Sequence, residues 1–66
     1  MSPAEIVCHY VHQFRRVYGK TPELETKRGF YYIANWRELG FRDAPKRQSL
    51  TNLSDMIEAW RDTKAA

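Results

Sequence analysis

The chain has 66 residues, of which 42% are hydrophobic and 14% aromatic, and its 11 Lys and Arg outnumber its 8 Asp and Glu for a net charge of +3. This length limits it to one small domain with little room for a deep pocket behind a full core, and the apolar content excludes a disordered chain. A lone cysteine, Cys8, excludes a disulfide framework. We therefore expect a single domain over residues 1–66, stabilised by an apolar core.

The first predicted element is a helix over residues 3–18. Ser2, Pro3 and Glu5 have the spacing of a helix N-terminus with a capping residue, a proline in the first turn and a capping-box glutamate. Apolar residues then recur at the spacing of one helical face, from Ile6 and Val7 through Tyr10, Val11 and Phe14 to Val17 and Tyr18. Gly19 is a typical residue just beyond a helix end.

A second helix is predicted over residues 22–39. Thr21 and Pro22 favour a helix start, and Gly40 followed by the apolar Phe41 is typical of a helix end. The stretch from Phe30 to Ile33 also has the aromatic and β-branched composition of a short strand. We prefer a helix here because the sequence shows no second strand with which this stretch could pair.

A third helix is predicted over residues 50–63, after a connection over residues 41–49 in which Pro45 prevents a helix. Residues 64–66 are expected to fray. Together the three segments predict an all-α fold, a small three-helix bundle. Its core is expected to centre on Tyr10, Phe14, Ile33, Trp36, Leu53, Ile57 and Trp60.

The sequence shows no pattern that indicates catalysis, since it has no nucleophile motif and no glycine-rich phosphate loop. Cys8, His9 and His12 are close enough in sequence to consider as metal ligands. However, nothing near them supplies the remaining ligands of a tetrahedral zinc site. We therefore expect a protein that is not an enzyme and that holds neither a metal nor another cofactor.

Basic residues concentrate at the end of the first helix, at the start of the second segment and in the long connection. Such residues contact phosphates without regard to sequence. They are Arg15, Arg16, Lys20, Lys27, Arg28, Arg42, Lys46 and Arg47. The alternative is an ordinary solvated surface, because acidic residues lie among them. A standard helix-turn-helix is disfavoured, because neither Gly19 nor Gly40 has the small and apolar residues that the motif requires around its turn glycine.

These clusters favour a small accessory or regulatory protein that contacts nucleic acid, either DNA or RNA. The alternative is a protein-binding regulator or inhibitor that docks an aromatic helix face on a larger enzyme or complex. That face would comprise Phe30, Tyr31, Arg37 and Phe41, and it could also bind a second copy of the chain as a homodimer.

The location of the protein is predicted from what the sequence lacks. Its longest uninterrupted apolar run, Phe30 to Ala34, is too short to cross a membrane. The N-terminal residues do not resemble a signal peptide. With a single thiol, these features predict a cytoplasmic protein without a membrane partner.

Overall fold

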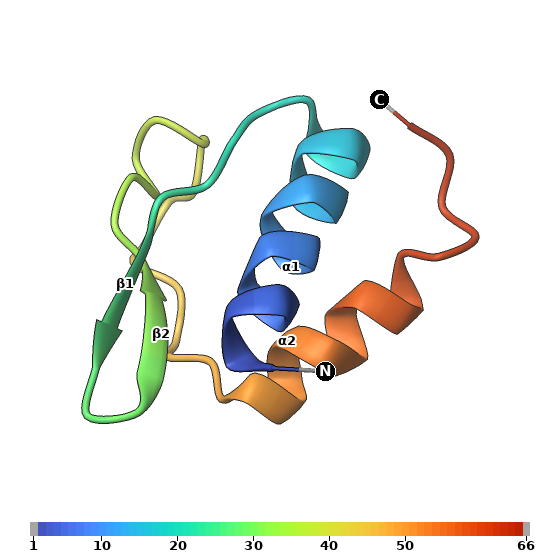
Figure 1. Ribbon diagram of the computed structural model, residues 1–66. Coiled ribbons are helices and arrows are strands. Elements are labelled where there is room, and N and C mark those ends of the chain that lie inside the picture. The colour runs from blue at the N-terminus through green and yellow to red at the C-terminus, as the bar shows by residue number, and fades with distance from the viewer. Residues whose placement is uncertain (1, 66) are drawn as a thin grey trace.

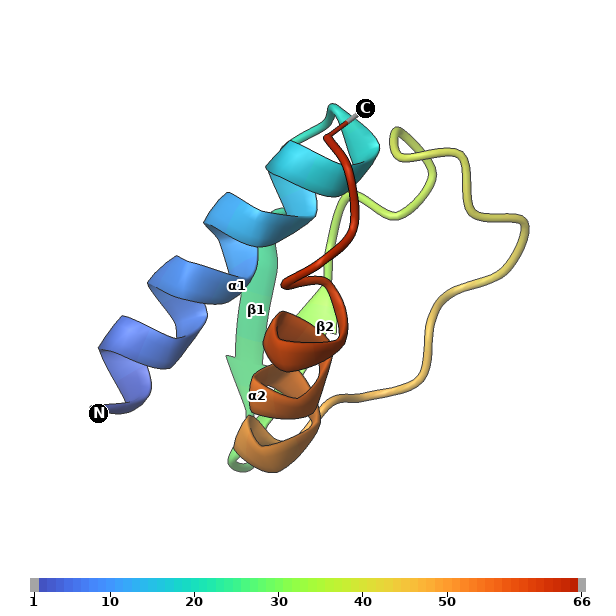
Figure 2. The same ribbon diagram turned by 90° about the vertical axis from the view of Figure 1, so that its right-hand side faces the viewer.

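The computed structural model describes residues 2–65 and contains two helices and one β-hairpin (Figure 1). The elements follow the order α1 (Pro3–Tyr18), β1 (Leu24–Lys27), β2 (Phe30–Ile33) and α2 (Leu50–Ala59). The fold is therefore an α+β mixture, and the predicted all-α three-helix bundle is wrong. Both helices begin near the closed end of the hairpin (Figure 1). The hairpin forms a second layer behind the helix pair, and the connection to α2 arches away from it (Figure 2).

Helix α1 matches the sequence prediction at both ends. The Ser2 hydroxyl accepts a hydrogen bond from the Glu5 backbone N–H at 3.3 Å, which satisfies a donor that the helix itself leaves without a partner. At the other end Gly19 adopts a left-handed conformation, with φ 76°, and its N–H donates to the Arg15 carbonyl at 2.8 Å. The helix buries Tyr10 and Phe14.

The segment predicted as the second helix is instead the antiparallel hairpin β1–β2. Lys27 pairs with Phe30, so Arg28 and Gly29 alone form the turn. Their φ angles of 51° and 79° are both positive, as a two-residue type I′ turn requires. In a helix, Gly29 would be less stable than alanine at that position by about 1 kcal/mol. In the turn, glycine is favoured because it adopts a positive φ without steric strain.

Strand alternation gives the hairpin a buried face and an outer face. Leu24 and Ile33 pair across the strands on the face that packs against the core. Lys27 and Phe30 pair on the opposite face. Strand β1 contributes few side chains to the core. Only Leu24 among its four residues is a large apolar residue. This composition explains why β1 has no clear strand pattern in the sequence.

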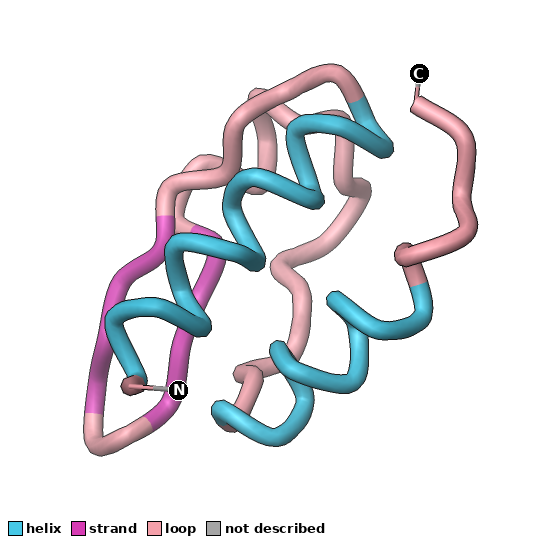
Figure 3. Tube along the Cα trace, turned by 45° about the vertical axis from the view of Figure 1, so that its right-hand side comes forward, coloured by secondary structure: helices cyan, strands magenta, loops and turns pink. Residues whose placement is uncertain are grey.

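A tight turn follows β2 and retains the helix end that the sequence predicted. The Gly40 N–H donates to the Arg37 carbonyl and the Phe41 N–H to the Trp36 carbonyl, both at 3.1 Å, and Gly40 has φ 92°. These two bonds are those of a Schellman motif. The predicted stop at Gly40 is thus present, but it closes one turn instead of a long helix (Figure 3).

The entry to β1 is held by the side chain of Asn35. Its Oδ1 accepts from the Glu23 N–H at 2.7 Å, and its Nδ2 donates to the Thr21 carbonyl at 3.0 Å. Pro22 between them is buried. The Thr21–Pro22 pair, predicted to start a helix, therefore fixes the path of the chain into a strand.

Helix α2 begins as predicted and ends earlier. The Ser49 hydroxyl accepts from the Asn52 N–H at 3.1 Å, but the helix stops at Ala59 and not at residue 63. Beyond it, carbonyls of Trp60 and Thr63 accept hydrogen bonds from the Arg16 guanidinium. The chain end predicted to fray includes Ala66, which lies outside the described residues.

The core lies where α1, β2 and α2 meet. Its buried residues are Tyr10, Phe14, Ile33, Leu53 and Trp60. All five were predicted, whereas the other two predicted centres, Trp36 and Ile57, are partly buried at its edge. The Trp60 ring packs against the Tyr10 ring at 5.4 Å and the Phe14 ring at 5.7 Å between centroids. Burial of the Tyr10 hydroxyl, with a smaller contribution from Tyr18, raises the pKa of Tyr10 to about 12.

Candidate nucleic-acid interface

Two basic segments that are distant in sequence meet at the closed end of the hairpin. Tyr31 and Gln48 form an antiparallel bridge, each donating its backbone N–H to the other's carbonyl at 2.8 Å. The bridge places Arg47 beside Phe30, with the guanidinium carbon 4.0 Å from the centre of the aromatic ring. We call Lys27, Arg28, Phe30 and Arg47 the hairpin-end cluster.

The hairpin-end cluster combines three cations with one aromatic ring. Lys27 lies opposite Phe30 in the strand register, and Lys27, Arg28 and Arg47 are all exposed. Phe30 is half-buried beneath the Arg47 guanidinium, an arrangement typical of a cation–π contact. Neither residues 26–31 nor residues 44–52 contain an acidic side chain. Glu25 lies on the same face of β1 as Lys27, so the cluster combines three cations with one neighbouring carboxylate, and its net positive charge favours an anionic partner.

The N-terminus of α2 adds to this field. Its capping residue, Ser49, follows Arg47 by two positions. The N-terminal end of a helix carries a partial positive charge. Figure 1 shows the start of α2 at the same end of the molecule as the hairpin turn. The start of α2 and the side chains of the cluster therefore both contribute positive charge, while Glu5 in the first turn of α1 contributes a negative charge at the same end.

Arg16 differs from the other predicted phosphate contacts because its guanidinium is engaged within the fold. Its Nη2 donates to the Trp60 carbonyl at 2.6 Å, its Nη1 to the Thr63 carbonyl at 2.5 Å, and its Nε to Gln13 Oε1 at 2.8 Å. The side chain is half-buried and bridges α1 to the end of α2. These hydrogen bonds make Arg16 part of the fold, and the interface proposed below does not include it.

The remaining predicted basic residues lie outside the hairpin-end cluster. Arg15 is exposed on α1, and Arg42 and Lys46 are exposed in the connection before α2. Lys20 follows α1, where its Nζ donates to the Glu38 carbonyl at 3.3 Å. The basic residues predicted as one interface are therefore distributed over both ends of the molecule.

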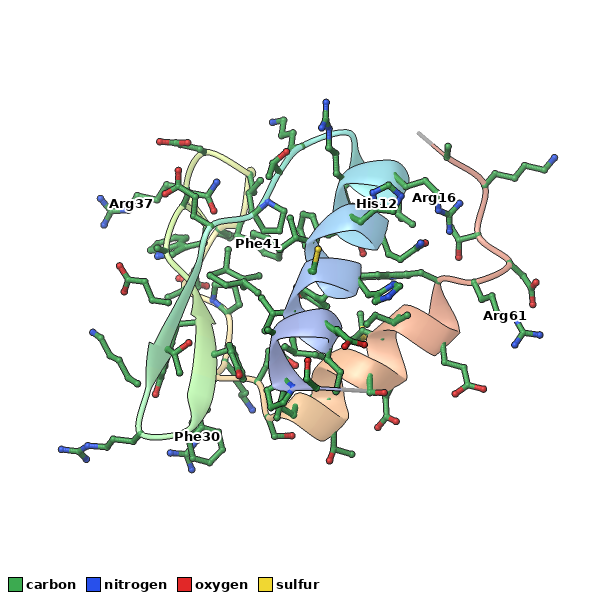
Figure 4. All side chains as sticks on the ribbon, in the orientation of Figure 1. His12, Arg16, Phe30, Arg37, Phe41 and Arg61 are labelled. Atoms are coloured by element: carbon green, nitrogen blue, oxygen red, sulfur yellow. The ribbon has the colours of Figure 1, made fainter. Side chains whose placement is uncertain are left out.

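The four residues predicted as an aromatic docking face do not share a face. Tyr31 and Phe30 point to opposite sides of the hairpin, and Tyr31 packs against the core. The Arg37 guanidinium lies over the Trp36 ring at 5.0 Å. Figure 4 shows Phe30 near the hairpin turn and Phe41 well away from it, beside α1. The predicted helix would have placed these residues on one common surface, whereas the hairpin and the turn after it separate them.

Phe41, which was predicted for the docking face, instead forms an exposed aromatic surface with Tyr18, a residue that the sequence interpretation placed on the apolar face of the first helix. Tyr18 is 53% exposed and Phe41 is 40% exposed, and both line one pocket. Tyr18 ends the apolar face of α1, and the sequence does not show that this side chain is only partly covered in the fold. Only the position of the turn at residues 34–40 reveals the surface.

The residues considered as metal ligands, Cys8, His9 and His12, are all exposed on α1. Across residues 2–65, no group of three or more His, Cys, Asp or Glu side chains is arranged to hold a metal ion. Within the same range, neither helix has the length and apolar character needed to cross a membrane.

Comparisons with protein-family models, with curated protein sequences and with solved structures returned no significant match.

Proposed function

We propose that this protein binds nucleic acid through the hairpin-end cluster, with Lys27, Arg28 and Arg47 on backbone phosphates. The observation that supports the proposal most is the Tyr31–Gln48 bridge, which brings the second basic segment to the first. Two short basic segments of the sequence thereby become one positively charged surface at an exposed turn.

Phe30 and Arg47 extend this proposal from phosphates to bases. Aromatic rings and guanidinium planes are both surfaces on which bases of a single strand stack. The stacked pair of Phe30 and Arg47 is already ordered, since the strand pairing fixes Phe30 and the Gln48 bridge fixes the backbone next to Arg47. Neither residue reads a base edge, so the proposed binding is independent of sequence.

Salt dependence tests the phosphate contacts directly. Each neutralised phosphate contributes about −0.9 to the slope of log affinity against log salt on duplex DNA and about −0.7 on single strands. Three cations therefore predict slopes of about −2.7 and −2.1, measured by fluorescence anisotropy with labelled DNA and RNA oligonucleotides. No binding to any of them, even at about 50 mM salt, would refute the proposal.

Arg28→Asn is the most informative variant, because asparagine suits the first position of a type I′ turn and keeps the hairpin intact. We expect weaker binding and a slope reduced by about one phosphate unit. Arg61→Gln is the matched control, since Arg61 is exposed and lies on the far side of the molecule from Phe30 (Figure 4). Equal losses in the two variants would indicate a general effect of net charge and contradict a localised site.

A further inference from the structure

A pocket lies at the opposite end of the hairpin from the hairpin-end cluster, between the end of α1 and the turn that follows β2. Its volume is about 310 Å³, and its lining comprises Phe14, Tyr18, Lys20, Leu39, Gly40 and Phe41. Four of these side chains are apolar or aromatic, and one is a cation. None of them belongs to the proposed nucleic-acid interface as the structure places it.

The walls of the pocket are held in place by the fold. The Tyr18 ring packs against the Phe14 ring at 4.6 Å and the Trp60 ring at 5.6 Å. The Phe41 backbone is fixed by its hydrogen bond to the Trp36 carbonyl. Exposing 53% of Tyr18 and 40% of Phe41 leaves apolar surface in water that an apolar ligand would cover.

Gly40 and Lys20 determine which ligand the pocket suits. A Cβ atom at Gly40 would meet no heavy atom within 4 Å, so a ligand can approach the backbone between Leu39 and Phe41. The Lys20 ammonium donates one hydrogen bond to the Glu38 carbonyl, which positions it at the pocket and leaves two further protons. A ligand with an apolar body and one negative charge would satisfy both features.

We propose that this pocket binds a small carboxylate with an aromatic or branched aliphatic body. The apolar body lies between Tyr18, Leu39 and Phe41, and the carboxylate accepts a hydrogen bond from Lys20. The volume is at the low end of ligand pockets, which favours a molecule the size of an arylalkanoate. Such a small ligand is expected to bind with a dissociation constant on the order of a millimolar.

The test is an NMR titration with 3-phenylpropanoate, using the amide signals of the chain's three glycines as reporters. Gly19 and Gly40 flank the pocket, whereas Gly29 lies in the hairpin turn. We expect saturable shifts at Gly19 and Gly40 and none at Gly29. The uncharged 3-phenylpropanamide should bind about two- to five-fold more weakly, the range of an exposed ion pair.

Two variants separate the apolar and the charged contributions. Lys20→Gln should weaken 3-phenylpropanoate binding about two- to five-fold and leave the amide unaffected, with Lys27→Gln as the control of equal charge. Phe41→Ala should weaken both ligands about ten-fold. The proposal would be overturned by equal affinity for 3-phenylpropanoate and 3-phenylpropanamide, or by unchanged 3-phenylpropanoate binding in Lys20→Gln. Shifts spread over all three glycines would overturn it as well. Because nucleic acid is absent from this titration, its outcome is independent of the proposed function.

Discussion

Replacement of Arg16 tests whether its guanidinium joins the two helices. In Arg16→Met the apolar stem is retained, but the hydrogen bonds to the carbonyls of Trp60 and Thr63 are lost. A hydrogen bond to a charged group contributes about 1.5–3 kcal/mol. The bond to Thr63 is exposed and water can replace it, whereas the bond to Trp60 is partly buried. We therefore expect a total loss of about 2 kcal/mol.

The matched control is Arg15→Met, which removes the same charge from the same last turn of α1 at an exposed side chain. Both variants lose the favourable interaction of a cation with the helix C-terminus, so their difference measures the Arg16 hydrogen bonds, those to the end of α2 together with the bond to Gln13 within α1. A loss of about 2 kcal/mol lowers the melting temperature of a domain this small by about 8–16 °C. Arg15→Met should change stability by less than about 0.5 kcal/mol.

Thermal and urea unfolding followed by circular dichroism provide the measurement. Arg16→Lys should recover only part of the loss, because an ammonium lacks the planar fork that reaches two carbonyls at once. If Arg16→Met and Arg15→Met unfold at the same temperature, the guanidinium does not hold α2. Arg16 would then return to the candidate phosphate contacts.

Three further predictions concern the core and the turn. Trp60→Ala should cost about 3–5 kcal/mol and leave little folded protein, and a near-native melting curve would show that the indole is not part of the core. Between pH 10 and 12 the free energy of unfolding should fall, because the unfolded chain loses the Tyr10 proton at its ordinary pKa while the folded chain retains it up to a pKa of about 12. Tyr10→Phe should flatten this decline. An identical decline in both proteins would contradict the role of Tyr10. Arg28→Asn should raise stability by up to about 1 kcal/mol, since asparagine adopts the left-handed conformation more readily than arginine and Asn-Gly favours the type I′ turn. A lower melting temperature would argue against that turn.

The sequence predicts the two helix starts and the buried centre because these depend on local, strong signals. Ser2 and Ser49 each precede an apolar periodic segment, and each accepts the expected hydrogen bond. Four of the five core residues, Tyr10, Phe14, Leu53 and Trp60, lie at helical spacing within the two predicted helices that the fold retains, and the fifth, Ile33, is a large apolar residue. These features require no knowledge of how distant segments pair.

The sequence does not predict the hairpin, because only one of its two strands has a recognisable strand composition. Phe30 to Ile33 has strand composition, but its partner, Leu24 to Lys27, has a single large apolar residue. The turn between them has arginine where asparagine or aspartate is usual. The signals at Pro22 and Gly40, both valid in other contexts, then favoured one continuous helix.

The candidate sites depend on contacts between distant segments, which periodicity does not reveal. Arg47 reaches Phe30 only through the Gln48 bridge, and Phe41 reaches Tyr18 only through the turn after β2. In the same way, Arg16 has the same charge as Arg15 in the sequence, but its position facing the end of α2 gives it a structural role. Residue type identifies the candidates, and only the fold shows which of them lie close together.

The central claim, that nucleic acid binds at the hairpin-end cluster, is tested most directly by NMR titration of the protein with a single-stranded oligonucleotide at low salt. The predicted result is a saturable shift of the amide signals of Gly29, Phe30 and Arg47 that disappears as salt is raised, while Gly19 and Gly40 keep their positions. Saturable shifts confined to Gly19 and Gly40, or no shift at any of these residues, would contradict the claim.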